Sequence, residues 1–177
     1  MRKRPLLRRI RGFVRLLLST SPILLGGCLY KFSGGGLPPG IHTVAVLPFD
    51  NLTPEPTLTQ EVTQAVREAV QNRLGLRGVG EGQADAIVKG TIQQYQPDLP
   101  LAFTGSTQTN RPVDVTKRMV RITVNVEILD QKAGKSLWKR DGLVVQGEYD
   151  PNNEAKGRKV ALDKLINEIV DGAQSQW

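Results

Sequence analysis

VRITVNVEI, residues 120–128, is the stretch that decides the fold, because apolar and polar side chains alternate along it. Successive side chains of an extended strand point to opposite faces of a sheet. The pattern therefore predicts a strand whose apolar face packs on helices and whose polar face meets water. The apolar set is Val120, Ile122, Val124, Val126 and Ile128, and the polar set is Arg121, Thr123, Asn125 and Glu127.

Three more strands are predicted around this one. Residues 42–49 are apolar on both alternations, as expected for a central strand covered on two faces. Residues 84–95 form a second apolar run. Residues 130–135 have the composition of a hairpin turn, and residues 137–149 beyond it predict a last strand with a bulge near Gly142.

A long polar loop is expected between the second and third strands, over residues 97–116. Pro97 and Pro100 end the second strand, and polar residues continue through Arg111 and Pro112. Connections of more than about 12 residues are uncommon in compact domains and are usually functional or disordered. The sequence therefore marks this segment for one of those two roles.

One amphipathic helix is predicted after the first strand. Apolar side chains recur at helical spacing over residues 58–74, with charged and amide side chains between them. Thr57 and Gln60 have the spacing of a capping box, and Gly75 stands where a helix would end. Packing of the apolar stripe on the sheet is the simplest role for this helix.

A second helix is predicted to open at Asp150-Pro151, with Asp at the cap and Pro at the first helical position. Its buried stripe consists of Leu162, Leu165, Ile166 and Ile169. The element order is therefore β-α-β-β-β-α. We predict an α+β fold in which two helices pack on one face of a four-stranded mixed sheet.

Residues 1–27 have the organisation of a signal peptide. Seven basic residues lie in the first fifteen positions, and an apolar stretch follows over residues 16–25. That stretch is too short for a membrane-spanning helix, which needs about 20 residues. The segment Leu25-Gly26-Gly27-Cys28 resembles the lipobox of bacterial lipoproteins, which implies that Cys28 becomes the first mature residue and carries acyl chains such as palmitate.

The mature chain is expected to begin with a tether and continue as one domain. Residues 28–40 are rich in Gly and Pro and connect the lipidated cysteine to a single α+β domain over residues 41–177. Residue 29 is Leu, whereas an Asp at this position often retains lipoproteins in an inner membrane. We therefore expect a lipid-anchored protein on the periplasmic face of the outer membrane.

The basic net charge of +7 comes from the N-terminal segment. Without its seven basic residues the chain has 24 − 7 = 17 Lys and Arg against 17 Asp and Glu. The domain is then formally neutral and has no general attraction for polyanions. Nucleic acid is accordingly not an expected partner.

Catalytic and metal chemistry find little support in the sequence. Cys28 is the only cysteine and His42 the only histidine, so neither an internal disulfide nor a Cys/His metal site can be assembled. A Cys28–His42 catalytic pair has no supporting residues around it, and His42 is interpreted as a bystander at the start of a strand. Phosphate-binding loops and nucleophile elbows are also missing. We expect no enzyme activity, catalytic residue, metal or cofactor.

A series of segments resembles one known family. The segments are CLYKFS at 28–33, LPP at 37–39, TVAVLPFDNLTPEP at 43–56, ADAIVKG at 84–90, VRITVNV at 120–126, LW at 137–138 and GEYD at 147–150. Their order, together with the lipobox, resembles the LptE family of lipopolysaccharide-assembly lipoproteins. The resemblance implies a lipoprotein that plugs the outer-membrane barrel LptD, assists assembly of that barrel and takes part in lipopolysaccharide insertion at the cell surface.

Five basic residues are the densest candidates for contact with lipopolysaccharide, whose phosphates need basic partners. They lie on the third strand and on the neighbouring fourth strand: Lys117, Arg118, Arg121, Lys139 and Arg140. Ordinary solubilising surface charge is the competing interpretation of the same residues.

Two other kinds of outer-membrane lipoprotein share strand openings such as VAVLPF at 44–49. Activators of peptidoglycan synthases usually carry a long linker after the cysteine, whereas the tether here is only about a dozen residues. Curli-type secretion lipoproteins contribute their own membrane-spanning strands, and no lipid-facing alternation of about ten residues is found. An enzyme of cell-wall metabolism lacks a catalytic constellation.

Overall fold

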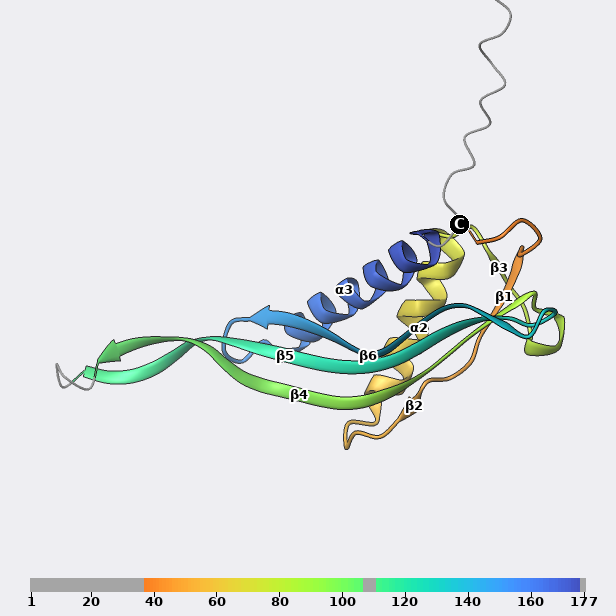
Figure 1. Ribbon diagram of the computed structural model, residues 1–177. Coiled ribbons are helices and arrows are strands. Elements are labelled where there is room, and N and C mark those ends of the chain that lie inside the picture. Colours follow the sequence, from red (N-terminus) through yellow and green to blue (C-terminus); the bar gives the residue numbers. More distant parts are fainter. Residues whose placement is uncertain (1–36, 107–110, 176–177) are drawn as a thin grey trace, which may run out of the picture. The chain divides into compact units, whose positions relative to one another are not determined.

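Long antiparallel strands dominate the computed structural model, which describes residues 37–106 and 111–175 (Figure 1). The strands are β1 (Thr43–Val46), β2 (Asp50–Asn51), β3 (Arg77–Gly78), β4 (Ala86–Ser106), β5 (Arg111–Asp130) and β6 (Lys135–Tyr149). The helices are α2 (Thr57–Asn72), α3 (Glu154–Ser175) and a short 3-10 turn, η2 (Glu81–Gln83). Within these residues no helix is long and apolar enough to cross a membrane.

The sheet is mixed, as predicted, but has six strands instead of four. Its order is β3-β1-β4-β5-β6, and β2 pairs with β4 beside β1. β1 runs parallel to β3 and β4, whereas β4, β5 and β6 are antiparallel. β2 and β3 have only two residues each, so they are too short to show a hydrophobic period in the sequence.

Both helices pack on one face of the sheet, so the predicted layering is confirmed (Figure 1). The five apolar residues of the segment 120–128 are at most 2% exposed. Helix α2 buries Leu58, Val62, Val66 and Val70 in the same hydrophobic core. Burial of this stripe supplies most of the driving force for the layering, because the hydrophobic effect scales with apolar area removed from water.

Helix α3 approaches the sheet more closely than the predicted stripe implies. Leu165 and Ile169 are buried as expected, but Leu162 and Ile166 are only half-buried. Small residues take their places: Gly157, Ala161 and Ala173. A methyl group added to Gly147 of β6 would lie 1.8 Å from the carbonyl oxygen of Gly157, so two glycines permit the contact between helix and strand.

The predicted N-terminal caps of both helices are wrong, whereas Gly75 does stand at the end of α2, with a left-handed φ of 68°. Helix α2 has Pro56 at its N-cap with no side-chain capping bond, and the Thr57 hydroxyl donates to the Glu55 carboxylate at 2.6 Å. Helix α3 begins at Glu154, later than predicted, because Asp150 to Asn153 form a turn. Asn152 adopts a left-handed φ of 70° there, a conformation that asparagine tolerates better than most residues.

The long loop expected over residues 97–116 is also wrong. β4 continues through Pro97 and Pro100 to Ser106, and β5 begins at Arg111. Among the described residues, no strand pairs with the outer edge of β4 beyond Ile92. Proline is tolerated on such an edge because no ladder bond needs its missing N–H, and register shifts occur on both sides of Pro100.

The far part of this hairpin is a two-stranded ribbon. β6 ends at Tyr149, which pairs with Arg118. Beyond that row, residues 101–106 of β4 and 111–117 of β5 pair only with each other in the described structure. We refer to these two segments as the ribbon. In Figure 1 the ribbon extends past the end of α3.

Candidate functional site

The sheet face opposite the helices, here called the open face, carries the polar side chains of the alternating strand. Arg121, Thr123, Asn125 and Glu127 are all half-buried, because neighbouring side chains on β4 and β6 shield them. Lys89 of β4 forms an ion pair with Glu127 at 3.3 Å, and Lys139 of β6 lies on the other side of Glu127. The open face is therefore a polar surface on which charged side chains form rows across neighbouring strands.

The five basic residues proposed from the sequence do not form one cluster. Lys117, Arg118 and Arg121 lie near the junction between the sheet and the ribbon, while Lys139 and Arg140 pair with Glu127 and Val126. Five residues of strand separate Arg121 from Val126, which corresponds to about 17 Å. The structure thus keeps the first three residues on one stretch of β5, with Arg118 on the opposite face from Lys117 and Arg121, and places the other two apart.

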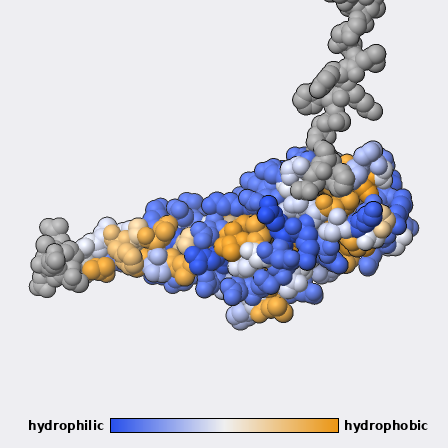
Figure 2. Space-filling view, in the orientation of Figure 1, coloured by the Kyte–Doolittle hydropathy of each residue, from blue (hydrophilic) through white to orange (hydrophobic). Residues whose placement is uncertain are grey.

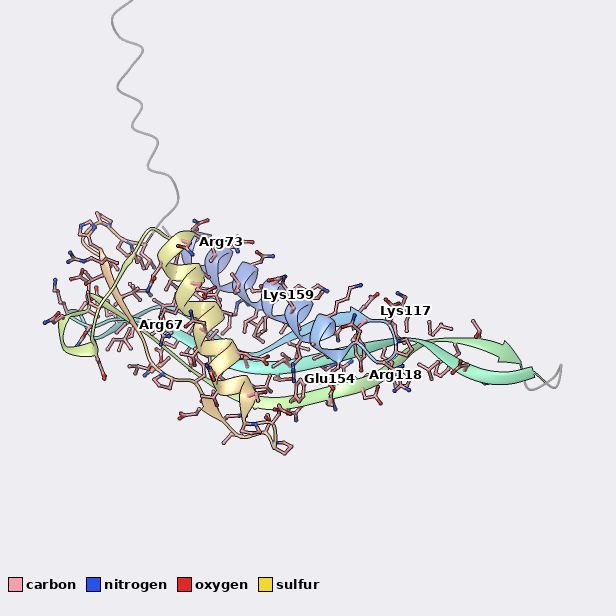
Figure 3. The ribbon with its side chains drawn as sticks, turned by 180° about the vertical axis from the view of Figure 1, so that it is seen from behind. Arg67, Arg73, Lys117, Arg118, Glu154 and Lys159 are labelled. Carbon is pink, nitrogen blue, oxygen red and sulfur yellow. The ribbon has the colours of Figure 1, made fainter. Side chains whose placement is uncertain are left out.

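Lys117 and Arg118, both labelled in Figure 3, are already bound to carboxylates. The ammonium group of Lys117 lies 2.5 Å from Asp150, and this hydrogen bond raises the pKa of Lys117. Arg118 forms an ion pair with Asp98, whose pKa is lowered mainly by the bond to Arg118 and further by one from Tyr149. Both basic residues therefore fix the junction between the ribbon and the sheet.

Lys139 is surrounded by acids. It lies 3.0 Å from Asp141, and the hydrogen bond to Asp141 raises the pKa of Lys139. A shallow pocket on the open face includes Lys139 and Lys89 in its lining together with Asp50, Glu127 and Asp141. Three carboxylates against two ammonium groups make this pocket unfavourable for an anion. Arg140 forms no ion pair with a described residue.

Arg121 has a different environment, because only amides contact its guanidinium. One of its nitrogens donates to the side-chain oxygen of Gln96 at 3.4 Å, and its Nε lies 3.1 Å from the amide oxygen of Gln146 in the orientation that satisfies both groups. Gln96, Arg121 and Gln146 occupy one row across β4, β5 and β6. No carboxylate of the described residues lies within 4.0 Å of Arg121.

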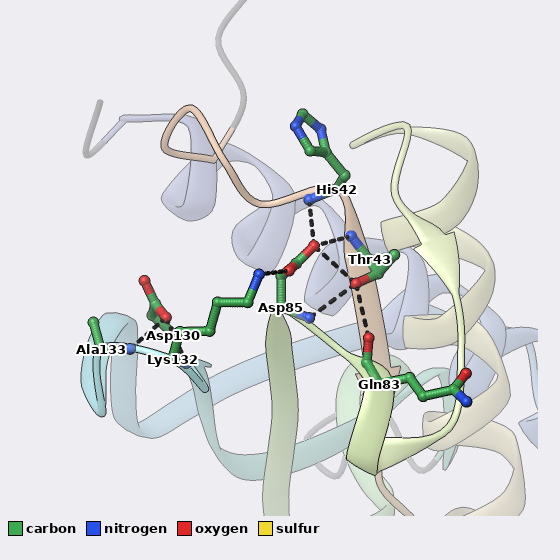
Figure 4. Close-up of polar contacts among 7 residues, drawn as sticks. All are labelled: His42, Thr43, Gln83, Asp85, Asp130, Lys132 and Ala133. Atoms are coloured by element: carbon green, nitrogen blue, oxygen red, sulfur yellow. Dashed lines mark hydrogen bonds and ion pairs between the residues drawn. The ribbon is translucent and has the colours of Figure 1, made fainter.

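A second polar cluster holds the start of the domain together (Figure 4). The Asp85 carboxylate accepts hydrogen bonds from the backbone N–H groups of His42 and Thr43 and from the Thr43 hydroxyl. The ammonium group of Lys132, in the β5–β6 turn, lies 2.6 Å away. These bonds, the one from Lys132 foremost, hold the pKa of Asp85 far below its ordinary value.

This cluster is structural. It ties the beginning of β1 to the beginning of β4 and to a turn 47 residues further along the chain. His42 contributes its backbone N–H, while its side chain is exposed. Sequence reasoning missed the cluster, because only the tertiary fold brings these segments together.

On the helix side, two tyrosine hydroxyls form hydrogen bonds at the junction between the ribbon and the sheet. The hydroxyl of Tyr149 donates to the carbonyl oxygen of Pro97 at 2.6 Å, and the hydroxyl of Tyr95 bonds to Glu154 at the start of α3. Burial first, and the bond to Glu154 second, raise the pKa of Tyr95. Arg158 joins the network through Glu154 at 3.4 Å and Glu61 of α2 at 3.5 Å.

Two sequence expectations lie partly or wholly outside the described residues. Cys28, the signal peptide at 1–27 and most of the tether at 28–40 belong to the part of the chain that the structure does not describe. Within the described part, no group of three or more His, Cys, Asp and Glu could hold a metal ion.

The fold and the open face define a class of protein. It is an α+β domain in which helices cover one face of a long-stranded mixed sheet and leave a polar surface on the other face. The sequence model of the LptE family, described as lipopolysaccharide-assembly, matches residues 41–173. The chain belongs to the LptE family, which confirms the resemblance found in the sequence. That family is a non-enzymatic lipoprotein family.

Several solved structures are similar to this chain at low sequence identity. A protein from Xanthomonas campestris has a TM-score of 0.50 at 10% identity, with 80% of this chain and 90% of that chain covered. A PelC dodecamer from Paraburkholderia phytofirmans has a TM-score of 0.49 at 13% identity, covering 80% and 96%. The rare lipoprotein B from Shewanella oneidensis has a TM-score of 0.34 at 13% identity, covering 75% and 89%. No curated protein sequence matches the chain.

Family membership supports an outer-membrane lipoprotein of the lipopolysaccharide-assembly type. The likeness to the Xanthomonas campestris protein shows a shared fold alone.

Proposed function

We propose that this chain is an outer-membrane lipoprotein, anchored on the periplasmic face through acyl chains on Cys28, that plugs an LptD-type barrel and assists its assembly. In this role it takes part in lipopolysaccharide insertion at the cell surface. The observation that carries the proposal is the LptE family match over residues 41–173. Residues 41–177 act as one domain in this proposal, with residues 1–27 removed as a signal peptide.

The open face supports the plug role. Water-filled membrane barrels have polar inner walls, and a plug needs a surface that can hydrogen-bond to such a wall. The open face offers amide, hydroxyl and charged groups on three neighbouring strands, including Lys89, Thr91, Thr123 and Asn125. The helices leave this face uncovered, so it is available to a partner without any rearrangement of the core.

Lipopolysaccharide contact is proposed for five basic residues: Lys117, Arg118, Arg121, Lys139 and Arg140. They differ in whether a carboxylate already binds them, and this difference decides which are better suited to bind a phosphate. Lys117, Arg118 and Lys139 each have a carboxylate partner that a phosphate would have to displace. Arg121 and Arg140 have no such partner among the described residues. A guanidinium group without a bound carboxylate is well suited to hold a phosphate, so these two arginines come first.

Affinity purification of the full-length lipoprotein from detergent-solubilised outer membranes, followed by mass spectrometry, tests the plug role. We expect one large β-barrel protein in an equimolar complex. Recovery of a penicillin-binding protein would favour a peptidoglycan-synthase activator instead. Recovery of the chain alone as a homo-oligomeric ring would favour a curli-type secretion lipoprotein, and either result would contradict the proposal.

Charge reversal tests the lipopolysaccharide contact separately. The double variant Arg121→Glu/Arg140→Glu is expected to bind lipopolysaccharide at least about tenfold more weakly, because two charge-assisted contacts are lost. Lys159→Glu, on the exposed side of α3, changes charge by the same kind of substitution away from the open face and serves as the control. Unchanged binding of the double variant would remove these arginines from the proposal.

A further inference from the structure

The ribbon exposes large apolar side chains beyond the helix-covered part of the sheet. Leu101 is 44% exposed, Phe103 57% and Val113 51%. Figure 2 shows hydrophobic residues gathered along this part of the surface. A two-stranded hairpin that packs on nothing is only marginally stable in water. Exposed apolar patches of this kind usually mark a site of interaction.

The β4 strand of the ribbon is mostly apolar near its base. Residues 99–103 of β4 read Leu-Pro-Leu-Ala-Phe without a polar residue, and register shifts on both sides of Ala102 interrupt the regular alternation of faces. Polar residues follow farther out on β4 and on the paired segment of β5: Thr104, Asp114 and Thr116. Leu99 pairs with Met119, and Phe103 pairs with Val115. The ribbon therefore lacks the one-sided alternation that residues 120–128 show. A flexible apolar ligand can cover such a surface more easily than the rigid inner wall of a barrel can.

The backbone groups on the edges of the ribbon argue against two kinds of partner, another β-strand and the interior of a membrane. Pro97 and Pro100 in β4 and Pro112 in β5 lack the N–H groups that another strand would need. Other backbone groups on these edges remain unpaired among the described residues, and such edges are not tolerated inside bilayer hydrocarbon. The ribbon is thus poorly suited to strand pairing or to full insertion into a membrane. Single acyl chains lying on its faces leave the edges in contact with water.

The positive charge of Arg121 at the base of the ribbon indicates that the ligand also carries an anionic group. The row of Gln96, Arg121 and Gln146 lies next to the row of Leu99 and Met119 on the sheet. Arg121 is bound by amides alone within the described structure, so its positive charge is available to an anionic group. Glu148, opposite Met119, is a carboxylate at the base of the ribbon, but it forms no ion pair with Arg121 within 4.0 Å.

The distance from Arg121 into the ribbon is comparable to the length of a lipid. Six residues of β5 separate Arg121 from Val115, the partner of Phe103, which corresponds to about 20 Å along a strand. One leaflet of bilayer hydrocarbon is about 15 Å thick, half of the whole core. An acyl chain of that length, joined through its headgroup to a phosphate at Arg121, would pass Met119 and Leu101 and end near Phe103 and Val115, short of Val113.

We propose that the Arg121 row and the ribbon form one binding site for an anionic, acylated lipid: the phosphate is bound at Arg121 and an acyl chain lies along the apolar side chains of the ribbon. This site rests on the proposed function and deepens it, because it assigns the two chemical halves of lipopolysaccharide to two parts of one hairpin. The ribbon provides apolar contact area, while Arg121 fixes the position of the headgroup.

Binding isotherms with the full mature chain and two probes test this site. The probes are intact lipopolysaccharide and its fully deacylated, phosphorylated saccharide. The variant Leu101→Ser/Phe103→Ser is expected to bind intact lipopolysaccharide roughly tenfold more weakly, because two apolar side chains lose their contacts. Its affinity for the deacylated probe is expected to stay unchanged. Arg121→Gln is expected to weaken binding of both probes.

A matched control is available on the same chain. Leu52, in the loop between β2 and α2, is 72% exposed and lies outside the ribbon, so Leu52→Ser tests the effect of removing an exposed leucine elsewhere. We expect Leu52→Ser to bind both probes like the wild type. Thermal unfolding of each variant checks that it is folded. Leu52, Leu101 and Phe103 are exposed and Arg121 is half-buried, so we expect all variants to fold.

The outcomes separate this proposal from the proposed function. If Leu101→Ser/Phe103→Ser binds intact lipopolysaccharide like the wild type, the acyl-chain contact is wrong, and lipopolysaccharide binding itself still stands. Loss of barrel co-purification with unchanged lipopolysaccharide affinity would assign the ribbon to a protein contact and would overturn the site as well. If the wild type binds neither probe, the proposed lipopolysaccharide function fails along with the site.

Discussion

The strands β4 and β5 have two different environments along their lengths, and the contrast separates the stability of the fold from its binding surface. From Ala86 to Ile92, β4 lies between β1 or β2 and β5 beneath the helices, and Val88 and Ile92 are fully buried. In the ribbon the same strand has one neighbour, and Phe103 is 57% exposed. Apolar residues in the first environment stabilise the fold, whereas those in the second are free to contact a ligand.

The junction between these environments is held by polar contacts. Tyr149 bonds to the carbonyl oxygen of Pro97, Arg118 to Asp98, and Lys117 to Asp150. These bonds connect the last row of β6 and the turn before α3 with the first residues of the ribbon. The direction of the ribbon is therefore set by the folded domain, and not by the hairpin alone.

Truncation of one apolar side chain in each environment tests the contrast most directly. Ile122→Ala in the helix-covered part is expected to lower the free energy of unfolding by about 2 to 5 kcal/mol. Val113→Ala in the ribbon is expected to change it by less than about 0.5 kcal/mol, because the side chain is half exposed. Urea unfolding of both variants measures the difference. Equal losses would mean that the ribbon is part of the stabilising core.

The close approach of α3 to β6 gives the next largest effect. Gly147→Ala places a methyl group against the backbone of Gly157, and such overpacking costs about 1 to 3 kcal/mol. Gly80→Ala is the control, since no atom lies within 4 Å of the added methyl and its φ of −68° suits alanine. Urea unfolding again provides the measurement. A Gly147→Ala variant as stable as Gly80→Ala would show that α3 can move away from the sheet without loss.

The Asp85 cluster predicts a smaller effect that depends on pH. The pKa of Asp85 is lowered in the folded chain, so its contribution to stability is complete above the ordinary Asp pKa of about 3.9 and is lost as the pH falls through the folded value. Asp85→Asn is expected to lower Tm at pH 7, by less than Ile122→Ala does. Between pH 4 and pH 2 the two curves should converge. A constant Tm difference down to pH 2 would contradict this assignment.

The ion pair on the open face should have the smallest effect. Lys89 and Glu127 lie 3.3 Å apart and are partly exposed, and such pairs contribute about 0.2 to 1 kcal/mol. A double-mutant cycle of Lys89→Met and Glu127→Gln measures this coupling. A coupling above about 2 kcal/mol would show that the open face stabilises the fold itself, which would weaken its interpretation as a surface reserved for a partner.

Several parts of the fold could be predicted from local sequence patterns. The alternation over residues 120–128 identified the strand and its buried face, and the spacing in residues 58–74 identified α2. The turn at 130–135 and the bulge near Gly142 were also correct: Gly134 and Gly142 have positive φ, and Gly142 lies at a register shift between β5 and β6. These features depend on neighbours in sequence, so the sequence displays them.

Other features escaped prediction for identifiable reasons. Pro97 and Pro100 indicated the end of a strand, because a central strand cannot accommodate them, but the outer edge of β4 is free at these positions in the described structure. Strands β2 and β3 have two residues each and no period to detect. The start of α3 was placed too early, because Asp150-Pro151 has capping chemistry that the chain uses in a turn instead.

The candidate site, too, was predicted only in part from the sequence. Charge clustering in the sequence selected five basic residues, Arg121 among them. Only the fold distinguishes them, because it places Asp150, Asp98 and Asp141 beside Lys117, Arg118 and Lys139 and leaves Arg121 between two amides. Asp98 and Asp150 lie 20 and 33 residues away from their basic partners in the sequence, so the number of basic residues could not reveal which of them already carried a carboxylate.

The sequence by itself determined the family, the two layers and the identity of the buried strand face, because hydrophobic period and segment order are local properties of the chain. The tertiary structure alone decided that residues 101–106 form a ribbon outside the core and that Arg121 stands apart from the carboxylates. The physical reason is that exposure and ion pairing depend on which distant segments share a neighbourhood. β6 and α3 pack together and stop before the ribbon, and that arrangement leaves an apolar surface beside Arg121.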